Sequence, residues 1–482
     1  MTSAAAAVPV PSSSNAARAA WRTFWLTSAA VFLVSLDATA VVAAYSALRA
    51  QFTGVSIAAL SWTLNAYTIL YAALLVPAGR LADLLGRKRV FLQGLVLFTV
   101  ASCLCAFAPG VEALIGARGL QSVGAALLTP AALALVLNAF AREKRAAAVG
   151  LFSAVGALAA AVGPAFGSWV IDHASWRWIF LINAPIGVLA WWLSRSRLAE
   201  STSPETGTKP DIPGIALLVL GAGAIAFGIV QSDSWGWRSG PMSPATWGSL
   251  AAGLASIAGF VGWAHGRPSA ALDITLFEDR SFLFVNLATL VFGAAFTMMF
   301  LSSFLFLMGV WGYSQSLAGI AVTPGPLMVI PVAIVAGRLA GRIGHRPMLL
   351  AGGLLYAAAQ GWLHLRIGVR PDYLGTWLPA QIAGGTAVGL ILPALSGAAV
   401  ARLGPTRFGV GGGVNNALRQ MGGAIGAALT VAIVGRVGAS LIQFQTVYAL
   451  LSGMGLLTAL LCLPVDTRPT TVAAVKPLPA TA

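Results

Sequence analysis

Fourteen apolar runs fill most of this 482-residue chain, and they decide what it can fold into. Crossing a bilayer as a helix takes roughly 20 mostly apolar residues. Inside lipid every backbone polar group must be bonded within the protein, which favours helices for such runs. We therefore predict an all-α polytopic membrane protein with 14 transmembrane helices. The runs are 24–45, 58–78, 90–108, 113–137, 146–169, 178–193, 212–231, 246–264, 281–309, 316–337, 347–366, 374–400, 412–435 and 444–464.

The basic residues between these runs predict the orientation. Most of the Lys and Arg fall in the loops and tails that share a side with the N-terminus, including 80–89, 142–145 and 338–346. Cytoplasmic loops carry such an excess of positive charge. We expect both termini in the cytoplasm. The preference for arginine over lysine is typical of a GC-rich bacterium, which suggests a multi-pass protein of the bacterial inner membrane.

Several classes of function are disfavoured. A net charge of +15 would suggest nucleic acid in a soluble protein, but here it belongs to short loops. No stretch fits the GxxxxGK[ST] phosphate loop, and no pair of acids shares a helix face, so we expect neither an ATPase nor another enzyme. The three cysteines lie in apolar runs, so no metal or cofactor is expected. Transport of a small molecule remains, by a monomer whose other partners are protons and membrane lipids.

An internal repeat predicts the domains. "GRLADLLGRK" (79–88) returns as "GRLAGRIGHR" (337–346), and "LLTPA" (127–131) aligns with "LILPA" (390–394). The second alignment also places Gly150 opposite Gly413 and Gly163 opposite Gly426. Internal repeats of helices are typical of secondary transporters. We predict two six-helix bundles plus an inserted pair of helices. The parts are a disordered tail 1–23, a bundle 24–193, a linker 194–280 holding the pair 212–231 and 246–264, a bundle 281–464, and a tail 465–482.

The chain resembles the major facilitator superfamily, specifically its fourteen-helix drug:proton antiporter branch. The similarity covers about residues 20–465, although Leu84 stands where a basic residue is usual, and Ser122, Ala159 and Ser168 stand where glycines are usual. It rests on "GRLADLLGRK", "RGLQSVGAALLTP" (118–130), "GLFSAVGALAAAVGPAFGS" (150–168), "WRWIFLINAPIG" (176–187) and "NNALRQMGGAIG" (415–426).

Asp37 is the only acid deep in any predicted span. A buried acid costs roughly 2.5–3.5 kcal/mol on insertion scales, and such acids usually serve ion or proton paths. Arg118 has a similar depth, about 9 Å from the outer face. By the resemblance, helices 1 and 4 face each other, so we expect an Asp37–Arg118 pair that couples protons to substrate. The alternatives are a structural acid and an arginine that extends to the interface.

The opening motif of the repeat is a candidate latch. Gly79 and Gly86 suit a tight turn between helices, and Asp83 sits among basic residues where it can meet Arg87. The resemblance implies that Asp83 and Arg87 hold the two halves together while the cavity faces outward. The alternative is a simple positive anchor, and the second copy has Gly341 in place of the acid.

Two further groups of residues carry weaker expectations. By the resemblance, Gly150, Gly163, Pro164 and Gly167 form an antiporter motif at the interface that rocks, although small residues also serve plain helix packing. Gln121, Thr129 and Arg419 are candidates for the cavity wall, with no defined role for Arg419, which could also extend to the interface.

The leading hypothesis is a proton-coupled secondary transporter that exports drugs or other amphipathic small molecules by alternating access. A proton symporter for a metabolite and a transport-inactive membrane sensor or scaffold remain as alternatives. The intact Asp37–Arg118 pair argues against the last of these.

Overall fold

The computed structural model describes residues 13–55, 57–201, 211–231, 243–267, 270–272, 274–404, 407–434 and 440–467, and among these it contains helices and no strand. The N-terminal half ends with a broken helix, because α6 and α7 together form one span. Its helices are α1 (Ser13–Gln51), α2 (Ile57–Leu85), α3 (Arg87–Ala106), α4 (Val111–Ala139), α5 (Arg142–His173), α6 (Arg177–Leu181) and α7 (Asn183–Arg197).

The C-terminal half follows an inserted pair, α8 (Ile212–Gln231) and α9 (Pro244–Ala264). Its second and fourth spans are each built from two elements, α11 with α12 and η3 with α14. The elements are η2 (Ile274–Glu278), α10 (Arg280–Gly309), α11 (Gln315–Val322), α12 (Pro324–Ile343), α13 (Arg346–Arg366), η3 (Tyr373–Trp377), α14 (Leu378–Ala401), α15 (Phe408–Val434) and α16 (Leu441–Leu461).

Twelve helical segments in the described part of the chain are long and apolar enough to cross a membrane. The two long helices outside this set are α5, of 32 residues, and α15, of 27 residues. Both are rich in glycine, and both pack against helices of the other half, α5 on α12 and α14, α15 on α2 and α4. Together these elements account for the fourteen helices that the sequence predicts, so the all-α polytopic fold is confirmed.

The start of the first helix differs from the prediction. α1 begins at Ser13, so residues 13–23 are helical, and the expected disordered tail 1–23 is wrong over that stretch; residues 1–12 lie outside the described residues. Alanine and arginine dominate "NAARAAWR" (15–22), and both are strong helix formers. The exposed Trp21 also makes edge-on ring contacts with Phe24 and Phe140, which attach this extension to the end of α4.

The two halves repeat one packing scheme. α1 packs on α5 as α10 packs on α15, and α3 packs on α4 as α13 packs on α14. Gly150 of α5 lies against the backbone of Ala333 in α12, and its repeat partner Gly413 of α15 lies against the backbone of Leu75 in α2. The glycines that the alignment pairs therefore occupy equivalent contacts between the halves.

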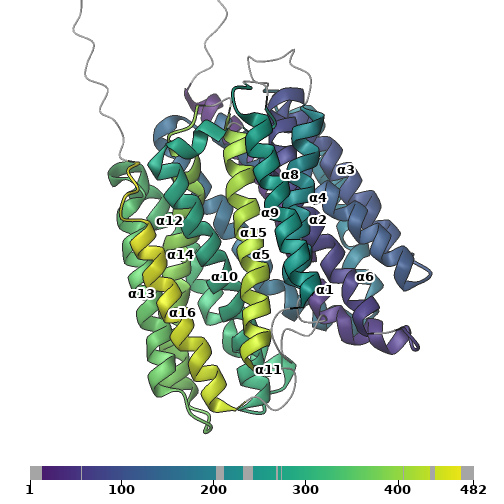
Figure 1. Ribbon diagram of the computed structural model, residues 1–482, viewed down its shortest axis with the longest axis vertical. Helices are drawn as coiled ribbons and strands as arrows, with labels where there is room; N and C mark the ends of the chain where they lie inside the picture. The colour runs from purple at the N-terminus through teal and green to yellow at the C-terminus, as the bar shows by residue number, and fades with distance from the viewer. Residues whose placement is uncertain are drawn as a thin grey trace, which may run out of the picture.

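The inserted pair lies outside this symmetry. α8 and α9 pack on each other, and α8 also packs on α2 and α15, so the pair borders both halves (Figure 1). Trp62 of α2 contacts Phe227 of α8 at 5.5 Å between ring centroids. The inserted pair therefore packs on the outer surface of the other twelve helices and does not enter the space between the halves.

Candidate functional site

Asp37 of α1 and Arg118 of α4 form a buried ion pair. Arg118 Nη1 donates to Asp37 Oδ2 at 2.6 Å, and the two residues are 1% and 2% exposed. Arg118 Nε donates to the carbonyl oxygen of Thr63 in α2 at 3.2 Å. A charge this deep is tolerated only when it is paired and hydrogen-bonded. The arginine therefore points into the protein and does not extend to the interface.

Uncharged polar side chains complete the coordination of the pair. Asn183 Nδ2 and Gln121 Nε2 both donate to Asp37 Oδ1, at 2.9 and 3.0 Å. The same two amides also donate to Ser102 Oγ, and Arg118 Nη1 donates to Gln121 Oε1 at 2.6 Å. All of these residues are buried. The sequence predicted Gln121 on the cavity wall, but the structure places it inside this network.

Two tyrosines connect the ion pair to the opposite half. The Arg118 guanidinium lies 4.2 Å from the ring centroid of Tyr67, and that ring stacks on Tyr71 at 5.7 Å. The Tyr71 hydroxyl lies 2.9 Å from Thr129 Oγ1 and accepts from Asn416 Nδ2 of α15 at 3.3 Å. A continuous series of contacts thus runs from the ion pair in the N-terminal half to α15 in the C-terminal half.

A central cavity of about 340 Å³ lies between the halves. Its walls come from α1, α2, α4 and α5 on one side and from α10, α14 and α15 on the other. Tyr67, Tyr71 and Thr129 line it, and so does Arg419, whereas Asp37 and Arg118 do not. The buried ion pair is therefore separated from the cavity by Tyr67, which contacts both.

Arg419 lies deeper than its sequence position suggests. α15 begins at Phe408, so Arg419 is about 16 Å along the helix from that end, against about 10 Å for a helix starting at 412. Its side chain is exposed to the cavity, and both Nε and Nη2 donate to Asn416 Oδ1, at 3.2 and 2.5 Å. This geometry places the guanidinium in the cavity wall and excludes the extension to the interface.

The junction of α2 and α3 forms the second part of the candidate site, with Asp83 in the last turn of α2 and Arg87 at the start of α3. Arg87 donates to Asp83 Oδ1 through Nε at 2.9 Å and through Nη2 at 2.7 Å, and both residues are buried. Asp83 Oδ2 accepts from the backbone N–H of Val410, in the first turn of α15, at 3.2 Å. Helix N-termini favour negative charge. The acid therefore joins the two halves, which a loop that served only as a positive anchor would not do.

The predicted turn is correct for Gly86, which lies between α2 and α3, and wrong for Gly79, which lies inside α2. A Cβ on Gly79 would lie 2.3 Å from the carbonyl oxygen of Gly409, so α2 and α15 touch here backbone to backbone. Gly86 has φ of 105°, a conformation that favours glycine, and it precedes α3. Glu200 accepts from the backbone N–H groups of Lys88 and Arg89 and so caps that helix.

In the second copy of the motif, both residues of the ion pair are replaced. Gly341 replaces the acid, and His345 stands at the position of Arg87. His345 is buried, its Nδ1 lies 2.9 Å from Thr467 Oγ1, and burial lowers its pKa to about 4. A neutral imidazole needs no counter-ion, which explains how this loop can do without an acid.

The glycines of the antiporter motif lie at two different contacts. Gly150 meets α12 of the other half, whereas a Cβ on Gly163 would clash with Thr39 of α1 within the same half. Gly167 is buried in α5, and the side chain of Pro164 lies outside the described residues. Of the two glycines whose contacts are described, Gly150 alone lies between the halves.

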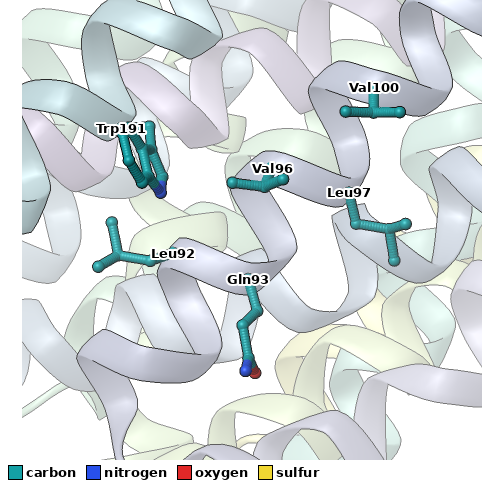
Figure 2. A pocket seen from close by; sticks show the side chains of 6 residues that line it. All are labelled: Leu92, Gln93, Val96, Leu97, Val100 and Trp191. Carbon is teal, nitrogen blue, oxygen red and sulfur yellow. The ribbon is translucent and has the colours of Figure 1, made fainter.

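A second hollow lies on the outer surface of the N-terminal half, away from these residues. Figure 2 shows Trp191 of α7 facing one side of α3 across it. Gln93, Val96 and Val100 are exposed there, so the hollow opens outward from the bundle. It is lined by Leu92, Gln93, Val96, Leu97, Val100 and Trp191. None of the candidate residues contributes to it, whereas Thr129 and Arg419 line the central cavity. Among the described residues no group of three or more His, Cys, Asp and Glu could hold a metal ion.

Three members of the network around Asp37 were not predicted. Ser102, Asn183 and Tyr67 are uncharged, and isolated polar residues in a span give no sequence signal for a partner. Asn183 had the clearest signal, since it is the one amide in "WRWIFLINAPIG". The helices that bring these side chains together belong to different parts of the first half.

Two pseudo-symmetric helical halves around a central cavity define a secondary carrier. The family model of the Major Facilitator Superfamily matches residues 27–314 and 285–479, so the chain belongs to this superfamily, as its motifs predicted. The chain is 33% identical over 409 residues to multidrug resistance protein Stp of Mycobacterium tuberculosis (strain ATCC 25618 / H37Rv), covering 84% of this chain and 74% of that protein.

Two further relatives have similar sequence identity to this chain. Identity is 32% over 415 residues to cephamycin export protein CmcT of Amycolatopsis lactamdurans, covering 85% of this chain and 84% of that protein. Identity is 34% over 412 residues to puromycin resistance protein pur8 of Streptomyces alboniger, covering 83% of this chain and 79% of that protein. The crystal structure of the human organic anion transporter MFSD10 (TETRAN) matches 92% of this chain and 99% of that one, with a TM-score of 0.64 and 14% identity. That likeness supports the fold alone.

Proposed function

We propose that this protein is a proton-driven exporter of drugs or other amphipathic small molecules that works by alternating access. The observation that carries the proposal is the buried Asp37–Arg118 pair, set behind the wall of a cavity between two halves. Acids this deep in a span usually serve ion or proton paths. Relatives named for multidrug resistance, cephamycin export and puromycin resistance support a drug as cargo.

Protonation of Asp37 is the proposed coupling step. A proton on the carboxyl removes its charge and weakens its bond to Arg118, which retains Thr63 and Gln121 as acceptors. The guanidinium can then shift over the face of Tyr67, and Tyr67 lines the cavity. Proton binding at a site outside the cavity would in this way change the shape of the cavity wall.

The loop around Asp83 is proposed to hold one end of the cavity closed. The bond from Val410 to Asp83 and the backbone contact of Gly79 with Gly409 join α2 to α15 at that end. Both must break for the halves to separate there. In the other half no carboxylate takes the corresponding place, since Gly341 has no side chain, and a single charged latch serves both halves.

The direction of transport driven by a proton gradient tests the proposal. Everted bacterial membrane vesicles made acid inside should accumulate at least one dye of a panel that holds fluorescein, rhodamine 123 and ethidium, and a protonophore should abolish the accumulation, because each proton moved supplies roughly 2.3 kcal/mol per 100 mV. Accumulation by right-side-out vesicles under an inward proton gradient would support the symporter alternative. Absence of gradient-driven transport of any probe compound in either orientation would support the sensor or scaffold.

We further propose a monomer in the bacterial inner membrane with both termini in the cytoplasm, which places the Asp83 loop on the cytoplasmic side. Single cysteines at exposed loop positions test this orientation, in a background that lacks Cys103. Cysteine at Ala141 should react with a membrane-impermeant reagent only in opened cells, and cysteine at Val369 should react in intact cells. The reverse pattern would invert the topology.

A further inference from the structure

The central cavity has one ionised side chain in its wall among the described residues. Arg419 supplies it, and no Asp or Glu lines the cavity. Asp37 has a side chain with no exposure and is already bound to Arg118. The wall therefore carries an uncompensated positive charge, and the buried acids of the described residues, Asp37 and Asp83, are both bound to other arginines.

The guanidinium of Arg419 has hydrogen-bonding capacity left over. Of its five N–H groups, one on Nε and one on Nη2 donate to protein acceptors in the described part of the chain, and both use Asn416 Oδ1. No carboxylate of a described residue lies within 4.0 Å of it. An amide oxygen neutralises none of its charge, so an anion in the cavity would meet an accessible cation with N–H groups still free to donate.

The remaining wall suits a molecule with an apolar body. Phe152, Leu133 and Val34 face the cavity from the N-terminal half, and Phe296 and Leu392 face it from the other. The volume of about 340 Å³ lies at the lower end of the range for drug-sized ligands. A compound with rings or alkyl chains and one acidic group matches this combination of apolar wall and single cation.

We infer that Arg419 binds the negative charge of the substrate, and that the exported compounds are amphipathic organic anions such as aromatic carboxylates. The inference rests on the proposed export function and narrows its substrate class. A cationic drug would instead approach an unpaired arginine of the same charge in a site of low dielectric, which disfavours its binding. Arg419 is thus a specificity residue of the cavity, distinct from Arg118, whose charge is already matched.

A pair of dyes that share a xanthene scaffold and differ in charge tests this. Fluorescein is an anion at neutral pH, and rhodamine 123 is a cationic ester. Purified protein should bind fluorescein more tightly by fluorescence polarisation, and Arg419→Gln should weaken fluorescein binding by about tenfold or more, as expected for a lost charge-assisted hydrogen bond. Arg419→Lys should keep part of the affinity, and rhodamine 123 should bind no worse to Arg419→Gln than to the wild type.

The matched control is Arg402→Gln. Arg402 pairs with Asp279 at 3.1 Å, and its side chain is 54% exposed at the end of α14, outside the cavity. This variant removes the same net charge and should leave fluorescein affinity unchanged. An equal loss for both dyes in Arg419→Gln, or wild-type preference for rhodamine 123, would overturn the inference, because either result would make Arg419 a structural residue.

Vesicle transport of the same dyes separates this inference from the function on which it rests. Gradient-driven accumulation of fluorescein, lost in Arg419→Gln and kept in Arg402→Gln, supports both. Preferential binding of fluorescein without transport of either dye would retain the anion site and refute export. Accumulation of rhodamine 123 alone would retain export and refute the anion site.

Discussion

At the residue scale, the charges were predictable and their uncharged partners were not. An aspartate and an arginine at similar depth in a bilayer must each find a counter-charge, and this requirement, with the resemblance that places helices 1 and 4 face to face, predicted the pair of Asp37 with Arg118. Asn183 and Ser102 follow no such rule, because a neutral polar side chain in a span can bond to several different groups. Gln121 was placed on the wrong surface for the same reason: the sequence does not reveal that α3 and α7 enclose it.

The first prediction concerns the proton site. Asp37→Asn should abolish gradient-driven accumulation in vesicles, a loss of at least about tenfold, because an amide cannot take up a proton. Binding of substrate in the cavity should persist, since the Asp37 side chain does not line it. Asp279→Asn serves as the control, because that acid forms a largely exposed pair with Arg402. Normal pumping by Asp37→Asn would remove this residue from the coupling mechanism.

The second prediction concerns His345 and acid stability. Burial lowers its pKa from 6.5 to about 4, so the folded protein resists a proton that the unfolded chain accepts. Stability should be complete above pH 6.5 and should fall as the pH drops toward 4, by about 2 kcal/mol at pH 5. Thermal unfolding in detergent should show this decline in the wild type. It should be smaller in His345→Gln and unchanged in His173→Asn, which alters an exposed histidine. Equal declines in all three proteins would assign the acid sensitivity to other groups.

At the element scale, the repeat in the sequence predicted which helices correspond, but not where they begin or break. Apolar runs mark the part of a helix that lies in lipid, so they missed the extension of α1 back to Ser13 and the early start of α15 at Phe408. The glycine pairs were more informative. Gly150 and Gly413 were matched from the alignment, and the structure places both at contacts between the halves. Such contacts need small residues, which leaves a trace in the sequence.

The third prediction tests the backbone contact between α2 and α15. A methyl group on Gly79 meets the carbonyl group of Gly409, and backbone cannot move aside as a flexible side chain can. Gly79→Ala should therefore separate the helices and reduce transport severalfold, with a lower Tm. Gly116→Ala in α4 is the matched control, since nothing lies within 4 Å of the added Cβ. Alanine is the better helix former, so this control should keep full activity with equal or slightly higher stability. Unchanged transport in Gly79→Ala would show that closure does not depend on this contact.

At the scale of the whole molecule, the sequence predicted two halves, a carrier and a proton site, but not the route that we propose between proton and cargo. That route depends on side chains from helices far apart in the chain. Tyr67 and Tyr71 of α2 stack on each other, and the far end of the series reaches Asn416 and Arg419 of α15. Neither tyrosine carries a charge or belongs to a motif that identified the family. The tertiary structure alone brings them between the ion pair and the cavity.

The last prediction follows from this series of contacts. Tyr71→Phe keeps the ring that stacks on Tyr67 but removes the hydroxyl that bonds to Thr129 and Asn416, and so interrupts the link to Arg419. If the link carries the coupling, substrate affinity in the wild type should depend on pH, and Tyr71→Phe should make that affinity less dependent on pH. The control is Thr68→Ala, another residue of the cavity wall, whose hydroxyl donates to Leu64 of its own helix and to no other described residue.

Coupling is a free energy that two sites share, and a double variant with Asp37→Asn measures it. Asp37→Asn and Tyr71→Phe should each reduce the pH dependence of affinity, and the double variant should reduce it no further than Asp37→Asn alone. Additive effects would mean that the tyrosine acts on the substrate directly. In that case Asp37 and the cavity would communicate through movement of whole helices and not through these side chains.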